Sequence, residues 1–269
     1  MRNAIELNND IHLTSNGLGA YIEQLAIIVI ADLHIGLEYA LMGDGTYLPV
    51  LQYPGIERSI LDMVDEYSPE KVIINGDFKH EFSKATTREW TEILDLWDAL
   101  AEKNVGLELV RGNHDNYLIN VLKQRGRSIH DPALVLDNIL ITHGHKPFDI
   151  PPEVDTVILA HEHPALGFRD ETGGKHKFKC YLTGTHNEKT VLVLPAYSPM
   201  ASGAVVNRSK IPSFLSPWLS SIDTSDLYPI VVDNGEILKF PPLKDLEPVD
   251  IYDDLLNKLE LYESKMEDQ

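Results

Sequence analysis

The stretch LAIIVIADLH, residues 25–34, contains the pattern that decides the fold. Residues 25–31 form a continuous apolar run, which is typical of a strand buried on both faces of a sheet. The run leads directly into Asp32 and His34, whose carboxylate and imidazole groups can bind a metal. A buried strand with such residues at its carboxyl end predicts an α/β fold whose functional groups gather at strand ends.

Four more apolar runs have the same character and lie at 71–75, 106–110, 138–142 and 156–160. Amphipathic helices are predicted at 56–67 and 86–103, because apolar residues recur there at helical spacing. Strands that alternate with helices favour βαβ units and a mostly parallel sheet.

Beyond residue 165 the pattern changes to closely spaced strands without a helix of useful length. Strands are expected at 177–184, 189–195 and 203–207, and a hairpin at 228–240. Asn-Gly in the middle of that hairpin suits its turn, since both residues tolerate a positive φ. These strands predict a second, antiparallel sheet packed against the first.

The remaining segments are expected to be loops and a final helix. Residues 41–54 and 167–175 are predicted as long loops, which often carry function. An apolar stripe predicts an acidic C-terminal helix over 250–269, which could dock on its own core, pair with a second copy as a homodimer, or bind a helicase or ligase. No linker or internal repeat interrupts the chain, so one domain is expected over residues 1–269.

Composition excludes several classes of protein. The net charge of −19, from 42 acidic and 23 basic residues, argues against a broad basic surface for duplex nucleic acid. The single cysteine, Cys180, excludes a disulfide framework and favours a reducing, cytoplasmic compartment. No apolar run is long enough to span a membrane, and the N-terminus lacks the blocks of a signal peptide, so no membrane partner is expected.

A polar cluster follows each of the five apolar runs. The clusters are Asp32-Leu33-His34, Gly76-Asp77-Phe78-Lys79-His80, Gly112-Asn113-His114-Asp115, His143-Gly144-His145 and His161-Glu162-His163. We expect them to converge, because the carboxyl ends of parallel strands meet at one edge of a sheet. Asp32 and His34 would point the same way in an extended segment, as would His161 and His163. Carboxylate, amide and imidazole donors without a thiolate suit Mn, Fe, Zn, Co or Ni.

The ordered motifs DxH, GDxxH, GNHD, HGH and HxH resemble the calcineurin-like metallophosphoesterase superfamily over about residues 25–165. The GDxxH and GNHD forms are similar to the branch of small SbcD-related archaeal and bacterial phosphoesterases. The resemblance implies a two-sheet β-sandwich core flanked by helices, with metals at the carboxyl ends of the strands. One departure is Ala160, which stands where the family usually has glycine; a slight backbone adjustment is expected.

The resemblance also implies roles for individual residues. The first of two divalent metals would be held by Asp32, His34 and His163, and the second by Asn113, His143 and His161, with Asp77 bridging them. His114 would stand beside the scissile phosphate as general acid or charge stabiliser. His80 would contact the substrate, the alternative being a surface histidine at a helix start.

The resulting prediction is a phosphoesterase with two divalent metals, manganese first among them and Fe, Zn, Ni or Co as alternatives. A metal-bridged hydroxide would attack a phosphodiester of a nucleic acid or nucleotide, with single-stranded nucleic acid as one substrate. The enzyme would then be a nuclease. The alternatives are a phosphomonoesterase or cyclic-nucleotide phosphodiesterase, and a non-catalytic scaffold of the same family, which would be expected to lose ligands.

Several other polar residues have two interpretations. Arg111 could contact phosphate or form a salt bridge within the fold, and His145 could support the ligands or serve the fold alone. Lys79 is expected in a solvated loop. The basic run from Lys175 to Lys179 could bind nucleic acid with the help of Phe178, or could be a solvated strand edge on which lysines discourage pairing.

Overall fold

A computed structural model describes residues 5–8, 10–43, 52–80, 87–119, 122, 127, 129–209, 213–233 and 236–249. The helix predicted over 250–269 lies outside these ranges, as does most of the loop predicted at 41–54. Within them, no helix has both the length and the apolar character needed to cross a membrane.

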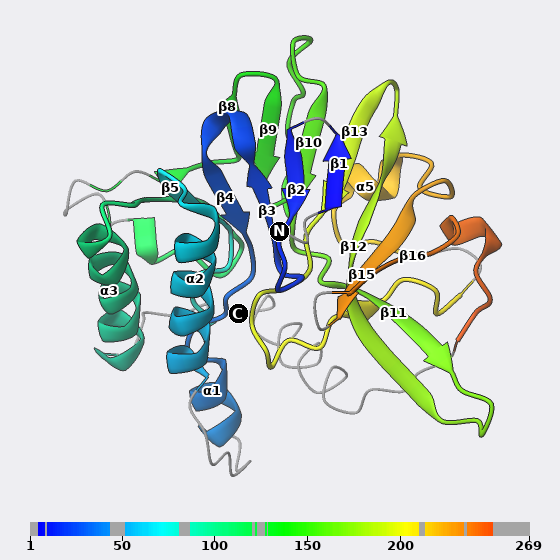
Figure 1. Cartoon of the computed structure of the whole chain (residues 1–269), viewed down its shortest axis with the longest axis horizontal. Helices are drawn as coiled ribbons and strands as arrows, with labels where there is room; N and C mark the ends of the chain where they lie inside the picture. Colours follow the sequence, from blue (N-terminus) through cyan, green and yellow to red (C-terminus); the bar gives the residue numbers. More distant parts are fainter. Residues whose placement is uncertain are drawn as a thin grey trace.

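The described strands form two sheets, the first of which comes from the N-terminal half of the chain (Figure 1). Its strands lie side by side in sequence order: β1 Ile5–Asn8, β2 Ile11–Leu13, β3 Gly19–Ile22, β4 Ile27–Ile30, β5 Lys71–Asn75, β6 Gly106–Val110 and β7 Ile129–His130. Pairing is antiparallel from β1 to β4 and parallel from β4 to β7.

The second sheet comes from the C-terminal half and runs in the order β14-β11-β12-β13-β10-β9-β8, with β15 paired to β12 and β16 to β15. Its strands are β8 Ala133–Leu136, β9 Ile139–Thr142, β10 Thr156–Leu159, β11 Pro164–Arg169, β12 Lys175–His186, β13 Lys189–Val193, β14 Ala204–Val205, β15 Tyr228–Asp233 and β16 Glu236–Lys239. Strands β9, β10 and β13 are parallel to one another.

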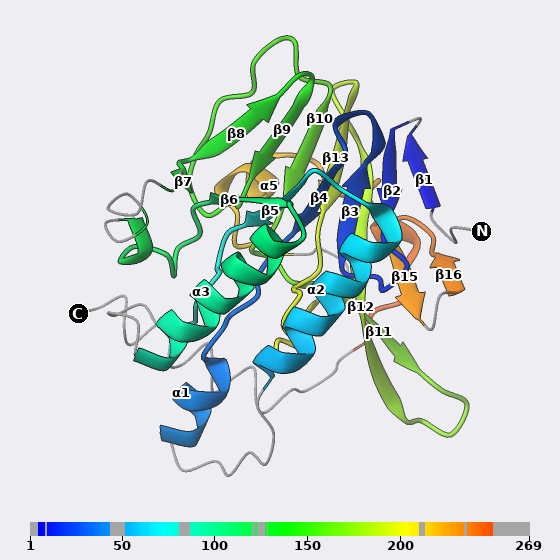
Figure 2. The same ribbon diagram turned by 60° about the vertical axis from the view of Figure 1, so that its left-hand side comes forward.

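The apolar runs are continuous because each strand is buried on both faces. On β4, Ile28 and Ile30 belong to the core formed with helices α2 (Tyr53–Tyr67) and α3 (Thr87–Glu102), which cover the outer face of the first sheet (Figures 1 and 2). Val29 of the same strand points inward and packs in a core that also contains Ile158 and Leu192 of the second sheet. The two-sheet sandwich implied by the resemblance is therefore the observed architecture.

One sequence prediction about these elements is wrong, and two predicted loops begin or end within regular elements. Residues 138–142 and 156–160 form β9 and β10 of the second sheet, so that sheet is mixed rather than antiparallel. The first sheet is completed instead by the short N-terminal strands. The loop predicted at 167–175 is the end of a hairpin between β11 and β12, closed by Asp170, whose carboxylate accepts the backbone N–H groups of Thr172 at 2.9 Å and Gly174 at 2.8 Å. Helix α1 (Leu37–Gly43) also occupies the start of the expected loop 41–54.

Candidate metal centre

The five polar clusters meet where the carboxyl ends of β4, β5 and β6 face those of β9 and β10. The seven predicted ligands therefore come from both sheets: Asp32, His34, Asp77 and Asn113 from the first, and His143, His161 and His163 from the second. Asp32, His34, Asp77 and His143 are buried. The predicted convergence is confirmed, although it occurs at the shared edge of two sheets rather than along one.

One group of donors surrounds Asp32. Its Oδ1 lies 3.4 Å from Nε2 of His163, and that nitrogen lies 3.3 Å from Nε2 of His34. Among the described residues, these three side chains form one of the groups whose donor atoms are close enough together to hold a metal ion.

A second group of the same kind contains Asp77, His143 and His161. Oδ2 of Asp77 lies 3.4 Å from Nε2 of His143, and Oδ1 of Asn113 lies 3.1 Å from that same nitrogen. The same Asp77 oxygen is 3.9 Å from Nε2 of His34 in the first group. Asp77 thus belongs to the second group and also approaches the first, as a bridging ligand would have to.

An unusual backbone conformation orients most of the predicted ligand side chains. Of the seven predicted ligands, five have a positive φ: Asp32, His34, Asp77, His161 and His163. A left-handed conformation is uncommon for non-glycine residues and costs about 1 kcal/mol or more at each, so the surrounding fold must enforce it. The expectation that the DxH and HxH pairs are extended is therefore wrong, since each member of the pair turns the chain.

Two glycines make this crowding feasible. A Cβ atom on Gly112 would lie 2.0 Å from Oδ1 of Asp77, and one on Gly76 would lie 2.1 Å from Nδ1 of His143. No real Cβ atom approaches another atom so closely, so only glycine fits at either position. Ala160, the departure from the family pattern, is buried and is absent from the residues with positive φ, so its methyl group causes no backbone strain.

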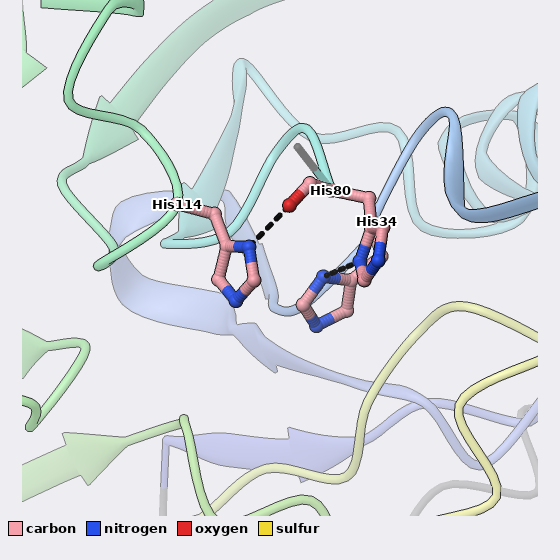
Figure 3. A group of neighbouring side chains, drawn as sticks. All are labelled: His34, His80 and His114. Atoms are coloured by element: carbon pink, nitrogen blue, oxygen red, sulfur yellow. Dashed lines mark hydrogen bonds between the residues drawn. The ribbon is translucent and has the colours of Figure 1, made fainter. Parts of the chain in front are cut away.

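His80 and His114 lie beside the first group (Figure 3). Their rings stack with centroids 5.4 Å apart, and Nδ1 of His114 donates to the backbone oxygen of His80. Because a carbonyl can only accept, Nδ1 carries the proton and Nε2 is the nitrogen left to face Asp77, 3.7 Å away. Nδ1 of His80 is 3.4 Å from Nδ1 of His34, so His80 lies at the centre rather than at the surface.

The donor set fits divalent metal ions. Oδ1 of Asp32 is fully buried and has no hydrogen-bond partner among the described residues, which is costly unless a cation compensates. Burial lowers the pKa of His34 and of His161 well below the usual range, which keeps both rings in the neutral form that binds metal. Burial also lowers the pKa of His143, but the nearby carboxylates of Asp77 and Asp32 outweigh it and raise that pKa to about 10.

Three buried polar residues that support the centre were not predicted. Nδ2 of Asn75 donates to the backbone oxygens of Thr142 at 2.9 Å and Ile158 at 3.4 Å, which joins the two sheets directly behind the ligands. The carboxylate of Asp115 accepts the backbone N–H groups of Phe78 at 3.1 Å and Gly112 at 2.9 Å. It therefore fixes the loops that carry the second and third motifs.

The third of these residues is Glu162, which lies between the two histidines of the HxH motif. Its carboxylate accepts the backbone N–H groups of Leu215 at 2.9 Å and Ser216 at 2.6 Å, and so ties the last motif to the segment before α5 (Pro217–Ser221). The only sequence signal for Glu162, Asn75 and Asp115 is their position inside or next to a motif.

Other polar residues near the motifs have structural roles. Arg111 forms the salt bridge within the fold that was one of its two interpretations, with Nη1 2.5 Å from Oδ2 of Asp131. Lys79 is fully buried, so the expected solvated loop position is wrong. The ring of His145 lies 5.2 Å from the ring of His143, which favours its supporting role.

The centre opens into a pocket that also has apolar lining residues. His34, Asp77, His114 and His161 are among its polar lining residues. The lining also includes residues 201–204, Leu37 of α1 and Leu215, which is 68% exposed. A phosphate at the ligands would therefore have apolar side chains beside its ester groups.

The chain is similar to known proteins in its sequence pattern and in its fold. The family model described as calcineurin-like phosphoesterase matches residues 25–179. The crystal structure of the Pseudomonas putida nuclease MPE superposes with a TM-score of 0.62 at 20% identity, covering 88% of this chain and 98% of that one. The E. coli phosphoesterase Yfce gives a TM-score of 0.38 at 15% identity, covering 80% of this chain and 98% of that one. No curated protein matches in sequence.

The matched residues contain all five polar clusters, and the metal-competent groups they form are those described above. The likeness to the Pseudomonas protein supports the fold of both sheets. The chain belongs to the calcineurin-like phosphoesterase family, whose members are hydrolases of phosphate esters.

Proposed function

We propose that this protein is a phosphodiesterase that uses two divalent metal ions, manganese first among them, to hydrolyse nucleic acids or nucleotides. The observation that carries the proposal is the position of Asp77, which belongs to one group of donors and approaches His34 of another, each group being able to hold one ion. Asp32, His34 and His163 would hold one metal, and Asn113, His143 and His161 the other. When bound, two such ions supply Lewis-acid charge to the phosphate and activate a water nucleophile.

The chain's own residues would orient the ester and handle the leaving group. Asp115 and Glu162 hold three of the motif loops through backbone hydrogen bonds, so the ligands are positioned before substrate arrives. His114 keeps its Nδ1 proton on the oxygen of His80 and presents Nε2 to the pocket. In the imidazolium form, Nε2 would donate its proton to the leaving oxygen.

This role requires the substrate to change the protonation of His114. Burial lowers the pKa of His114 in the protein alone, so the neutral ring dominates at neutral pH. A bound phosphate beside Nε2 would raise that pKa, because a nearby negative charge favours the cationic ring. His80, stacked on His114, excludes water from one face of this ring.

The pocket favours a diester over a small monoester. A monoester presents one organic group, whereas a diester presents two, and Leu37 and Leu215 place apolar surface beside the ligands for such groups. The Pseudomonas putida protein is a nuclease, which is consistent with this proposal, although that likeness supports the fold alone.

The test is hydrolysis of bis-p-nitrophenyl phosphate, p-nitrophenyl phosphate and single-stranded oligonucleotides with Mn²⁺. We expect turnover of both diesters, with kcat/KM at least tenfold above that of the monoester, and loss of turnover in Asp77→Asn. Asp98→Asn, which makes the same change on the exposed face of α3, is the matched control and should retain activity. Faster hydrolysis of the monoester would favour the phosphomonoesterase alternative, and no turnover with low metal content would favour the scaffold.

A further inference from the structure

The hairpin of β11 and β12 carries its basic residues on one face. Its register pairs Arg169 with Lys175, Gly167 with Lys177 and Ala165 with Lys179. Side chains that are two residues apart on a strand, or directly opposite across a pair, share a face. Arg169, Lys175, Lys177 and Lys179 therefore form one surface, which we call the cationic face.

The inner end of the cationic face borders the metal pocket. Nζ of Lys177 donates to Oγ of Ser202 at 2.8 Å and to the backbone oxygen of Gly203 at 3.1 Å, and both of these residues line the pocket. Nζ of Lys179 donates to the backbone oxygen of Ala196 at 2.8 Å, in the segment that leads to the same wall. Lys177 and Lys179 thus hydrogen-bond to the segment that lines the pocket.

The outer end extends away from the pocket along the hairpin. Strand β12 is antiparallel to β13, which is parallel to β10, so the tip of the hairpin points the same way as the carboxyl end of β10. Figures 1 and 2 show the hairpin projecting beyond the rest of its sheet in that direction. A chain leaving the pocket on this side would run along the cationic face.

Like charges face each other at the tip of the hairpin, across a turn that contains Asp170 and Glu171. Arg169 and Lys175 lie directly opposite each other, and like charges in that relation destabilise a hairpin. Both are exposed, and neither forms an ion pair within the described part of the chain, although the protein carries 42 acidic residues. Two neighbouring cations without acidic partners, in a protein with so many acidic residues, point to a polyanionic ligand.

The two interpretations of this basic run from the sequence are now distinguishable. Strand periodicity alone places the three lysines on one face, but lysines that only discourage edge pairing need no cation opposite them, and Arg169 supplies one from β11. The aromatic part of the nucleic-acid interpretation is not supported, because Phe178 is on the opposite face with its ring 5.8 Å from that of Phe168, which in turn packs against Phe240. The contact would therefore be to phosphates rather than to bases.

We propose that the cationic face binds the phosphodiester backbone of a single-stranded nucleic acid whose scissile phosphate lies in the metal pocket. This inference rests on the proposed function for the placement of that phosphate. Alternate residues on a strand are about 7 Å apart, so the cations form a narrow track along one chain. The net charge of −19 elsewhere opposes the broad contact that a duplex would make.

The test compares Arg169→Gln/Lys175→Gln with Lys71→Gln/Lys103→Gln. Each double variant removes two positive charges, but Lys71 is at the amino end of β5, away from the pocket at the carboxyl ends of the strands, and Lys103 follows the end of α3. Binding of a fluorescein-labelled single-stranded oligonucleotide is followed by anisotropy with Ca²⁺ in place of Mn²⁺. For the hairpin variant we expect the affinity for the oligonucleotide to fall about fivefold. The slope of log affinity against log salt concentration should also be smaller by about 1.4, because two phosphate contacts are lost and each contributes about 0.7 on a single strand.

The outcomes separate this inference from the proposed function. Hydrolysis of bis-p-nitrophenyl phosphate with Mn²⁺ should be unchanged in the hairpin variant, because that small diester does not reach the tip. Equal oligonucleotide affinity and equal salt slope in both double variants would overturn the cationic face while leaving the metal centre intact. If the natural protein hydrolyses no ester yet the hairpin variant alone loses binding, the proposed function fails and the cationic face stands.

Discussion

Substituting Gly112 by alanine tests the geometry of the centre with a single methyl group. The new Cβ would lie 2.0 Å from Oδ1 of Asp77 and 2.3 Å from its backbone nitrogen, whereas ordinary contact begins at 3.4 Å. The carboxylate and the strand end that carries it must therefore move by more than 1 Å. The φ of Gly112 is not positive, so alanine adds no backbone strain there and the effect is one of crowding alone.

Displacement of a catalytic group by about 1 Å can cost roughly a hundredfold in rate. We expect Gly112→Ala to lower kcat/KM for bis-p-nitrophenyl phosphate with Mn²⁺ by at least that factor, and to lose bound metal by elemental analysis. Gly55→Ala is the matched control, because a Cβ at Gly55 in the first turn of α2 meets nothing within 4 Å. Full activity and metal content in Gly112→Ala would refute the placement of Asp77 against this loop.

Three further predictions follow from the same contacts. His114→Ala should lower kcat for the diester by about a hundredfold or more while metal content stays unchanged, and a loss of metal would contradict its role beside the substrate. The carboxylates of Asp77 and Asp32 outweigh burial and raise the pKa of His143 to about 10. The charged His143 therefore stabilises the metal-free protein fully below about pH 6.5, and this stabilisation is lost as the pH rises through about 10. Thermal unfolding in EDTA should show Tm falling over that window, and a flat profile would contradict the charged pair. Asn75→Ala leaves two buried backbone oxygens without its hydrogen bonds and should lower the free energy of urea unfolding by about 2 kcal/mol; a change below about 0.5 kcal/mol would contradict the link between the sheets.

Much of the centre could be predicted because its chemistry is concentrated in short motifs. Each ligand follows an apolar run, and a run of this kind is recognisable without knowing its partners. The local pattern of an apolar run does not show which of the two sheets the strand will join. Residues 138–142 and 156–160 resemble the earlier runs, yet they pair with each other and, through β10, with β13, which is later in the chain. Strand pairing depends on contacts between distant residues, so no local pattern could have assigned β9 and β10.

Local backbone conformation was the second feature that the sequence could not provide. The alternation expected for Asp32 and His34 assumed an extended chain, whereas both residues have a positive φ that tertiary contacts enforce. The buried position of Lys79 was missed for a related reason, since lysine is rarely buried and nothing in its neighbours indicates it. The hairpin at 167–175 was missed because Gly173-Gly174 indicated a loop, although the same pair suits the turn at its end.

The central claim is that Asp77 bridges two metal ions. The most direct measurement is anomalous diffraction at the manganese edge from crystals of the protein grown with Mn²⁺. We expect two peaks beside the Asp77 carboxylate, one near Asp32 and His163 and the other near Asn113 and His161. A single peak among His34, His80 and His114, which form the third group of donors close enough to hold an ion, would contradict it.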